Sequence, residues 1–560
     1  MEQSEVKDYL HFAEVLLNGE HSQKRTEWES IAVMVAPELL NAAYLRENNE
    51  IDSERTCPEA AECADKLTGA HMSYLTPMGH YWFRYSAWGL ARKDLSDEEQ
   101  EEIALWFAKL TDAVKEAVER SNFYDEILST FYDRVVTGTG ALLCEEDTEA
   151  RLPWFTYVPM GTFAVANDAR RMPNNFVREL KMTAAQIAEE FPDAELSSQV
   201  LSALNKGASR CTDLFDVVHI IRPRKGWSKK MYSKYNPDTY PFESVYIEKS
   251  GMCCLSESGY HEFPVLVTRY STAGSQVYGT SPFVKAKDIL EDLRLLSDVA
   301  IESAKKKVMP PVLVPPELAG QVNIGAGGVT ILPAQYTNAN VPREWALSGD
   351  VRELLEQMER LKNALRAITQ VDYLEIISGV DREMTAREVI ARQGERVMAY
   401  ARTFTQFKTD FAPFLLCILN CCQRLGVVSW DDAPEALLDE NGKTPEPRVL
   451  YVGRMAQSME QAQGQAIDEV VTRIYELSSL TQNAALAMVI DEEKVARGQA
   501  IAAGMPSKYL RSVRKINELK EEVKLATEQR QMAQDNLAAA QTQEHAANAY
   551  RTIRETEALQ

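Results

Sequence analysis

The side chains that could carry chemistry in this chain are scattered and form no recognisable catalytic or metal-binding set. Only seven histidines occur, and neither His71 nor His80 lies in the HExxH spacing that places two zinc ligands on one helix face. The GxxxxGK phosphate loop followed by Ser or Thr does not occur, so no nucleotide hydrolysis is expected. GAGG at 325–328 lacks the strand-to-helix setting of a dinucleotide turn. The sequence predicts a protein that is not an enzyme and has neither metal nor cofactor.

The cysteines indicate structural thiols. The nine show no CxxC pair and no zinc spacing with histidine, and an odd number in a long chain is typical of reduced, buried side chains. They are Cys57, Cys63, Cys144, Cys211, Cys253, Cys254, Cys417, Cys421 and Cys422.

Length and charge set the broad class. A chain of 560 residues exceeds one ordinary core, so two to four subdomains are expected. The net charge of -22 argues against a protein that grips nucleic acid through a dominant basic surface, although nucleic acid could still slide past it. No apolar run approaches the roughly 20 residues of a membrane span, and the N-terminus lacks a signal-peptide pattern. The sequence therefore predicts a soluble protein that acts where it is made or assembled.

The elements that would position any functional residues are clearest between Tyr278 and Ile377, which read as two long helices around a proline- and glycine-rich insert. In YGTSPF, Thr280 or Ser281 can cap the first helix, and Pro282 suits its first position. Apolar residues then recur at helical spacing through 281–307. The helix is expected to end at three lysines that favour a helix C-terminus, Lys305, Lys306 and Lys307, ahead of a run of prolines.

The second predicted helix covers 348–371 and has a narrow apolar seam suited to packing against a neighbouring long helix. Its seam residues alternate in steps of three and four: Val351, Leu354, Met358, Leu361, Leu365 and Ile368. The insert, 308–347, contains two short β-like runs, Pro311 to Val314 and Val329 to Leu332, and is predicted to form a knob at the far end of the helices. Its candidate structural residues are Pro310, Pro311, Val314, Val329 and Ile331.

The remaining chain predicts an α+β protein that is mainly α. Residues 1 to about 145 read as helical, including the stretch that ends DRVVTGTGALL, and 151–277 as strands interrupted by one helix at TAAQIAEEF. Thr385 and Glu388 form a capping-box pattern that starts another helix, which is expected to pause at Pro413 and resume. Residues 372–384 are thus a short loop between long helices, and the chain after Tyr451 is predicted to be helical.

Four sequence blocks occur in an informative order between about Ala61 and Gln463: ADKLTGAHMSYLTPMGHYWFRY, VYGTSPF, TAREVIARQGE and YVGRMAQSMEQAQ. Each is weak alone, but in this order they resemble the portal proteins, or head-to-tail connectors, of short-tailed podovirus-type phages. The resemblance covers most of the chain.

The resemblance implies the portal-protein fold and a ring of identical subunits, usually twelve, at one capsid vertex of the virion. Double-stranded DNA would pass through the ring without sequence-specific contacts during packaging and ejection. The ring would be assembled in the host cytoplasm, would nucleate capsid assembly, and would have no membrane partner. Its protein partners would be the terminase large subunit, the tail adaptor, and the major capsid and scaffolding proteins.

The resemblance also assigns regions. It implies a wing, two stem helices, a clip, a tunnel loop facing DNA and a helical crown or barrel. These regions are 1–280 for the wing with its β-rich part at 151–277, 281–307 for the first stem helix, 308–347 for the clip, 348–371 for the second stem helix, 372–384 for the tunnel loop, 385–455 for a long wing helix and 456–560 for the crown or barrel.

Individual residues have two interpretations each. In the tunnel loop, apolar side chains could form a constriction around DNA or pack under the next subunit. The loop candidates are Tyr373, Glu375, Ile376, Ile377, Asp381 and Arg382. Lys305, Lys306 and Lys307 could contact phosphate in the channel or simply be solvated at a helix end. Arg352, Arg360 and Lys362 are further channel candidates, although ion pairs between neighbouring stems are favoured for them. Trp82 and Phe83 are expected to be core anchors rather than stacking platforms.

Two other classes of function compete with the portal interpretation. One is a homo-oligomeric helical scaffold or adaptor that associates through the 351–368 seam and handles no DNA. The other is a nuclease or other DNA-processing enzyme, which the lack of an assembled set of carboxylates, histidines or metal-ligand spacings disfavours.

Overall fold

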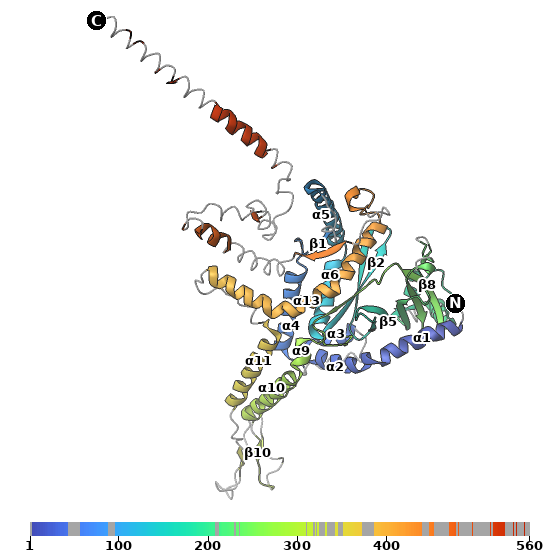
Figure 1. Cartoon of the computed structure of the whole chain (residues 1–560). Coiled ribbons are helices and arrows are strands. Elements are labelled where there is room, and N and C mark those ends of the chain that lie inside the picture. The colour runs from blue at the N-terminus through green and yellow to red at the C-terminus, as the bar shows by residue number, and fades with distance from the viewer. Residues whose placement is uncertain are drawn as a thin grey trace. The chain divides into compact units, whose positions relative to one another are not determined.

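Figure 1 shows the computed structural model of the whole chain. The chain divides into two compact units. The first comprises Met1–Trp82, Val114–Val428 and Gly453–Met455, and the second Phe83–Ala113, Ser429–Val452 and Ala456–Gln560. The structure describes residues 3–42, 56–87, 96–207, 212–228, 231–233, 236–309, 311–316, 351–371, 386–438, 447–452, 470–477 and 519–532, together with shorter pieces at 320, 322–323, 331–332, 342–344, 480, 495–496, 516, 541–542, 545, 551 and 554.

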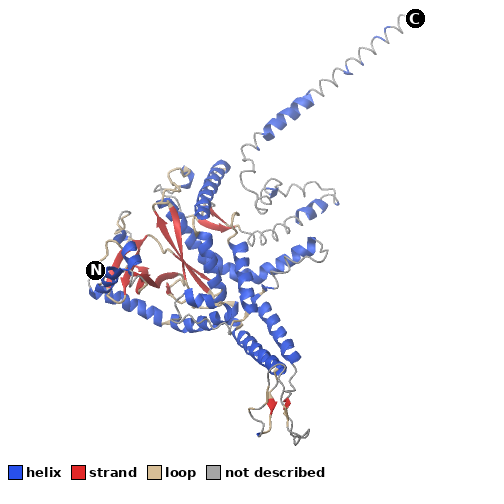
Figure 2. Ribbon diagram, turned by 180° about the vertical axis from the view of Figure 1, so that it is seen from behind, coloured by secondary structure: helices blue, strands red, loops and turns tan. Residues whose placement is uncertain are grey.

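Two antiparallel sheets pack face to face in the described part of the first unit (Figure 2). The five-stranded sheet has the order β4-β5-β6-β7-β8 and the three-stranded sheet the order β3-β2-β9. Their bounds are β2 Thr139–Asp147, β3 Leu152–Val158, β4 Phe163–Asn167, β5 Pro173–Thr183, β6 Leu214–Pro223, β7 Phe242–Glu248, β8 Cys253–Tyr260 and β9 Val265–Arg269. Side chains alternate between the faces of a strand, so Leu143 and Val267 of one sheet meet Phe176 and Ile221 of the other in a shared core.

Helices cover the outer faces of this sandwich. Phe155 of the three-stranded sheet packs on Phe123 of α6 (Phe123–Val136) and on Phe414 of α13 (Ala386–Arg424). On the other side, Val6 and Ala13 of α1 (Gln3–Asn18) pack on Val218 of the five-stranded sheet. Further helices of this unit are α2 Glu20–Val35, α3 Pro37–Ala42, α4 Pro58–Leu75, α7 Ala184–Glu190 and α8 Ser198–Lys206. The unit is therefore layered helix, sheet, sheet, helix.

Helix α6 also protects the edge strand of the smaller sheet. The Asn122 amide donates to the Phe155 carbonyl at 2.6 Å and accepts from the Phe155 N–H at 2.9 Å. Further along β3, Glu126 accepts from the Tyr157 N–H at 2.8 Å. Just beyond the strand, Asp133 Oδ2 accepts from the Met160 N–H at 2.9 Å. These bonds satisfy backbone groups that an open edge would leave free for pairing with another chain.

Asp133 is buried in this arrangement, and burial raises the pKa of its carboxyl from 3.8 to about 7, although bonds from Tyr157 and Met160 act to lower it. Because the pKa of Asp133 is higher in the folded state than in the unfolded state, protonated Asp133 contributes to the free energy of unfolding. This contribution is complete below about pH 4 and is lost as the pH rises through about 7. The Asp133→Asn variant should lack this dependence, which amounts to about 4 kcal/mol for a shift of about three pKa units.

Thermal unfolding midpoints measured from pH 4 to pH 8 test this expectation. The variant should gain stability relative to the parent as the pH rises, and Asp125→Asn, an exposed site on the same helix, should follow the parent throughout. Parallel curves for the parent and Asp133→Asn would contradict the assignment.

The described part of the second unit contains a two-stranded pairing, part of helix α5, and helical residues at 470–477 and 519–532, which agree with the helical structure predicted after Tyr451. Strand β1 (Phe83–Ser86) pairs antiparallel with β12 (Arg448–Tyr451). Helix α5 (Asp97–Arg120) begins in this unit, and its Trp106 lies 5.0 Å from Trp430, measured between ring centroids. A 3-10 turn, η6, covers Glu435–Leu437.

Two helices of the first unit form an antiparallel hairpin, visible side by side in both views (Figures 1 and 2). A short helix, α9 (Pro282–Lys285), leads into α10 (Lys287–Val308), and α11 (Val351–Thr369) returns along it. Near the far end, β10 (Val312–Leu313) pairs antiparallel with β11 (Arg343–Glu344). Among the described residues, no helix combines the length and apolar character needed to cross a membrane.

Several sequence-based expectations are confirmed. The fold is mixed α+β with mainly helical content outside the sheets. Trp82 and Phe83 are each 2% exposed, as core anchors should be. The predicted TAAQIAEEF helix corresponds to α7, which Thr183 and Gln186 begin with a capping box. Six described cysteines are buried and two half-buried, all as free thiols, while Cys211 lies outside the described residues.

Three local expectations are wrong. The helix predicted to continue through DRVVTGTGALL ends at Val136, because Gly138 adopts a φ of +99° and starts the turn into β2. Helix α13 runs through Pro413 without a pause, since packing of Phe411 and Phe414, 0% and 3% exposed, outweighs the missing hydrogen bond. The run Val329–Leu332, predicted to be β-like, is not a strand at its described residues Ile331 and Leu332, whereas β10 lies within the other predicted run and pairs with Arg343–Glu344.

Candidate functional site at the root of a helical hairpin

The first arm of the hairpin starts from a close approach of two glycines. A Cβ built on Gly279 would lie 2.2 Å from the Gly138 carbonyl oxygen, and one on Gly138 would lie 2.5 Å from the Gly279 carbonyl oxygen. The Gly279 N–H donates to the Thr139 hydroxyl at 2.9 Å. Of the two predicted caps, Ser281 is the one that accepts from the Val284 N–H, at 3.0 Å, and it donates to the Val136 carbonyl at 2.8 Å. The YGTSPF block therefore fixes α9 and α10 to the junction of α6 and β2.

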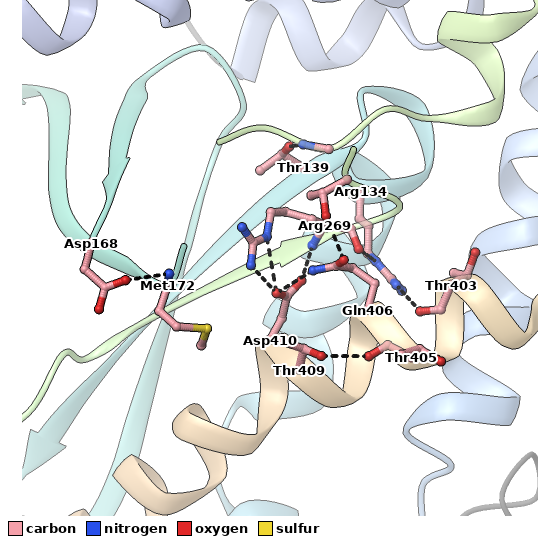
Figure 3. Close-up of polar contacts among 12 residues, drawn as sticks. Arg134, Thr139, Asp168, Met172, Arg269, Thr403, Thr405, Gln406, Thr409 and Asp410 are labelled. Carbon is pink, nitrogen blue, oxygen red and sulfur yellow. Dashed lines mark hydrogen bonds and ion pairs between the residues drawn. The ribbon is translucent and has the colours of Figure 1, made fainter. Parts of the chain in front are cut away.

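A buried ion pair fixes α13 to the same region (Figure 3). The Arg269 guanidinium donates to Asp410 Oδ1 from Nε at 3.2 Å and from its terminal nitrogen at 2.6 Å, while the Arg269 backbone N–H donates to Oδ2 at 2.8 Å. Gln406 Nε2 adds a bond to Oδ1 at 3.0 Å. Burial raises the pKa of Asp410 despite the opposing attraction of Arg269. The carboxylate thus depends on a complete set of donors.

Arg134 of α6 is a second buried cation at this junction. It donates to the Arg269 carbonyl and to the Thr403 carbonyl of α13, at 3.2 Å each. Its guanidinium lies 5.7 Å from the Tyr270 ring centroid, and burial lowers its pKa to about 10. Neighbouring His71 has its pKa lowered well below 6.5, by burial and then by the Arg134 charge, so it is neutral. Arg134 therefore links α6, β9 and α13 through carbonyl groups rather than through a carboxylate of its own.

The segment between β9 and α9 joins these two anchors. Thr272 donates to Gln406 at 2.9 Å, and Arg402 donates to the Thr272 carbonyl at 3.1 Å. Ser271 and Thr280 bond to each other across the segment, at 2.8 and 3.1 Å. The start of the hairpin and the anchored part of α13 consequently belong to one hydrogen-bonded assembly.

The second arm is fixed separately, against α4. Arg366 of α11 pairs with Glu59 of α4 at 2.6 Å. Thr369 and Val371 are 0% and 1% exposed, and the Thr369 hydroxyl donates a hydrogen bond to the Leu365 carbonyl at 2.9 Å. The chain thus leaves the hairpin from a buried position.

The predicted seam of α11 is buried to different degrees. Leu365 is 0% exposed, whereas Ile368 is 36% exposed. Leu354, Met358 and Leu361 are half-buried, and the side chain of Val351 lies outside the described residues. Because α10 contacts α11 within one chain, at least part of the seam packs inside the hairpin.

The charged channel candidates are on the surface of the hairpin. Lys305, Lys306 and Lys307 are exposed in the last turn of α10, and Lys306 lies 3.4 Å from Glu302. On α11, Arg352 and Arg360 are exposed and half-buried Lys362 lies 3.3 Å from Glu359. These positions leave both interpretations of each cation open.

The remaining candidates lie at the hairpin tip and beyond α11. In the tip, Pro311 is exposed, Val314 is half-buried and Ile331 is 90% exposed. The other two tip candidates, Pro310 and Val329, lie outside the described residues. So do the loop candidates Tyr373, Glu375, Ile376, Ile377, Asp381 and Arg382, and the Thr385 cap.

Sequence reasoning missed the network of Arg134, Arg269 and Asp410. A signal was present, because Asp410 falls between Phe407 and Phe411 on an otherwise aromatic helix face and Arg269 follows the apolar run VLVT. A lone charge in such a position is rarely buried unless it is paired. Within the described ranges, no group of three or more His, Cys, Asp or Glu could hold a metal ion. The hydrogen bonds of Arg134, Arg269 and Asp410 join α6, β9 and α13.

Comparison with known proteins gives consistent matches over most of the chain. The family model described as "Bacteriophage head to tail connecting protein" matches residues 16–510. The chain is 25% identical to the probable portal protein of Bordetella phage BPP-1 over 396 residues, 68% of each protein. It is 22% identical to the portal protein of Salmonella phage epsilon15 over 487 residues, 85% of this chain and 84% of that protein. A chain titled "Virion of native gene transfer agent (GTA) particle" covers 74% of this chain and 85% of its own length at a TM-score of 0.34 and 10% identity, a similarity that supports no further conclusion.

Proposed function

The chain belongs to the bacteriophage head-to-tail connecting protein family, and from this premise we propose that twelve copies form a closed ring at one capsid vertex through which DNA is packaged and ejected. Membership makes the protein a structural, non-enzymatic portal-type component of the virion. The number of copies, the DNA path and the partners below are parts of the proposal.

The observation that carries the proposal is the hairpin with its fixed root. A ring that transmits force needs rigid radial or axial elements, and α10 and α11 are held at their base by buried hydrogen bonds and ion pairs. Helix α10 also leaves apolar side chains in solvent: Leu295, Val299 and Ile301 are 60%, 39% and 54% exposed. In a ring these side chains would be covered by neighbouring copies, which removes apolar surface from water.

The acidic composition suits a conduit. A subunit with a net charge of -22, repeated around a channel, repels phosphate and would let DNA slide. In this proposal α10 and α11 are the stem, 308–347 is the clip and 372–384 is the tunnel loop. The loop would connect the buried end of α11 to α13, so that its position relative to DNA is set from both sides.

The clip is the proposed contact for the terminase large subunit during packaging and for the tail adaptor afterwards. The ring would also contact major capsid and scaffolding proteins when it nucleates assembly. The exposed Ile331, together with Leu313 at 54% exposed, gives the hairpin tip apolar side chains that a partner could cover.

Mass measurement and electron-microscope class averages of the purified protein test the central proposal. A closed ring of twelve subunits with a channel at least one DNA duplex wide is expected. An open or channel-free oligomer would instead favour the alternative, a helical scaffold without a DNA role.

Deletion of Glu375 to Asp381 tests the tunnel loop. Rings should form normally, because the anchors of α11 and α13 lie outside the deletion, while DNA packaging or retention should fall severely. The measurement is the fraction of DNA-filled heads produced with the variant. A matched control replaces Glu375 and Asp381 by Gln and Asn, which keeps the loop length. Normal filled heads from the deletion would remove the proposed role.

A further inference from the structure

Three buried cysteines gather where β2 meets α13. Cys144 lies on β2, and Cys417 and Cys421 lie one turn apart on α13, so the last two share one face of the helix. All three are free thiols, and they are 4%, 4% and 1% exposed. None of the three has a role in the proposed ring.

Strand pairing places Cys144 beneath this part of α13. Cys144 is opposite Phe155 in the pairing of β2 with β3, so the two side chains point to the same face of the sheet. Phe155 packs on Phe414 of α13, with ring centroids 6.1 Å apart. Cys417 follows Phe414 by about one helical turn, which brings it over Cys144. The Cys144 thiol forms hydrogen bonds with those of Cys417 and Cys421.

Cys417 is the better partner for Cys144. The Cys421 thiol also donates to the Glu145 carbonyl oxygen at 4.0 Å, which is a competing contact. The hydrogen bond with Cys144 acts to lower the pKa of Cys417, although burial raises that pKa overall. The hydrogen bonds with Cys417 and Cys421, and then burial, raise the pKa of Cys144 well above its usual value. Cys417 is therefore the thiol of the pair that ionises first, stabilised by the Cys144 S–H.

The three thiols line one pocket. Its volume is about 200 Å³, and Tyr260 and Arg424 also line it. The Arg424 side chain is 21% exposed, so the pocket reaches solvent. Hydrogen peroxide is little larger than a water molecule, whose share of liquid volume is about 30 Å³, and it fits in this space. A small oxidant can therefore reach thiols that are buried from larger molecules.

We propose that Cys144 and Cys417 are a modification site, and that they form a disulfide bond when the protein meets a peroxide. The Cys417 thiolate attacks one peroxide oxygen and breaks the O–O bond, which gives a sulfenic acid and one water. The Cys144 sulfur then attacks the Cys417 sulfur and displaces a second water. Two thiols and one peroxide thus give one disulfide and two waters, and the two electrons lost by sulfur reduce the peroxide.

The bond would fix α13 to β2 about two turns beyond the Asp410 anchor. A virion component leaves the cell in which it is made, so it meets first a reducing and then an oxidising environment. The long chain between the two cysteines makes this cross-link stabilising, because it restricts the unfolded state. The reduced and oxidised forms would differ in how firmly α13 is held. The inference applies to a single chain and does not depend on the ring.

Oxidation of the purified full-length chain tests the site. The protein is treated with hydrogen peroxide, its remaining thiols are alkylated, and its peptides are mapped by mass spectrometry without reduction. The major cross-link should join Cys144 to Cys417, and dithiothreitol should reverse it. The thermal unfolding midpoint of the oxidised protein should exceed that of the reduced protein by about 5 °C.

Two matched variants separate the site from general thiol oxidation. Cys144→Ala should form no cross-link to α13, and oxidation should not shift its midpoint. Cys422→Ala removes the adjacent buried cysteine of α13, which is outside the pocket lining, and should behave as the parent does. The peptide map of the parent decides the pairing even if a variant fails to fold.

Four results would overturn the proposal. They are sulfinic or sulfonic acids without a cross-link, a bond from Cys144 to Cys421 alone, a midpoint shift that Cys144→Ala retains, and loss of the cross-link in Cys422→Ala. A cross-link without a midpoint shift in the parent would overturn the fixing of α13 as its consequence.

Discussion

Replacing Asp410 by alanine will destabilise the first unit by about 3–5 kcal/mol, the cost of leaving a buried charge without its partner. The side chain of Asp410 is 0% exposed and that of Arg269 is 4% exposed. Alanine would leave the Arg269 guanidinium and its backbone N–H without their acceptor. Arg134 lies in the same network and is also cationic, so two uncompensated positive charges would remain beside α13.

Hydrogen exchange and chemical denaturation of the isolated subunit measure this effect. Amides of α13 around 403–414 should lose protection first, because that part of the helix is held by the ion pair. The matched control is Glu359→Ala, which removes the exposed pair with Lys362 and should cost less than about 1 kcal/mol. A loss of stability for Asp410→Ala as small as that of the control would show that the network does not hold the helix.

The double substitution Leu354→Asp and Leu361→Asp will abolish ring formation. Both side chains are half-buried on α11 in the single chain. A carboxylate at either position would lose its water if α11 stayed packed, and burying an unpaired charge is strongly unfavourable. The alternative is that α11 separates from the helix packed against it. The sequence-based seam already predicts this outcome; the structure adds that the packing of α11 on α10 within each hairpin would also be disrupted.

Subunit number by mass measurement decides the result. Gln357→Asp with Asn363→Asp adds the same charge to exposed positions of the same helix and should leave rings of normal size. Rings of normal size from the Leu354 and Leu361 variant would refute the seam assignment. If both variants fail to assemble, added charge on α11, rather than seam packing, is the cause.

The hairpin was predictable from sequence because its helices depend on local signals. Ser281 and Pro282 mark the start of the first arm and the lysines at 305–307 mark its end, and both ends agree with the structure to within a residue. The single helix predicted between them is instead divided at Ala286 into α9 and α10. The β-rich region was recognised from alternation, but β2 was not, since its residues read as a continuation of the periodicity of α6 until the two glycines of TGTG are taken as a turn.

The root could not have been predicted in the same way. Arg134, Arg269 and Asp410 are far apart in sequence, and only the packing of α6, β9 and α13 brings them together. The strand β11 is missed for a similar reason, because two-residue strands carry almost no periodic signal and the pairing of β10 with β11 depends on how α10 and α11 bring the ends together. Capping residues and apolar periodicity are local signals, so they identify single helices and strands. Ion pairs between elements far apart in sequence can be identified only once the fold is known.

The contact of Gly138 with Gly279 holds the hairpin at one end, so that a small tilt at this contact is amplified at the far end. Helix α10 has 22 residues and is therefore roughly 33 Å long at 1.5 Å per residue. A tilt of about 5° at the glycines would move the far end of the helix by about 3 Å on that length. The backbones of the two glycines approach so closely that no side chain fits between them. Small rearrangements beside α13 should therefore be transmitted to the hairpin. In a symmetric ring, every hairpin would tilt by the same angle, and the diameter of the opening enclosed by the hairpin tips would change.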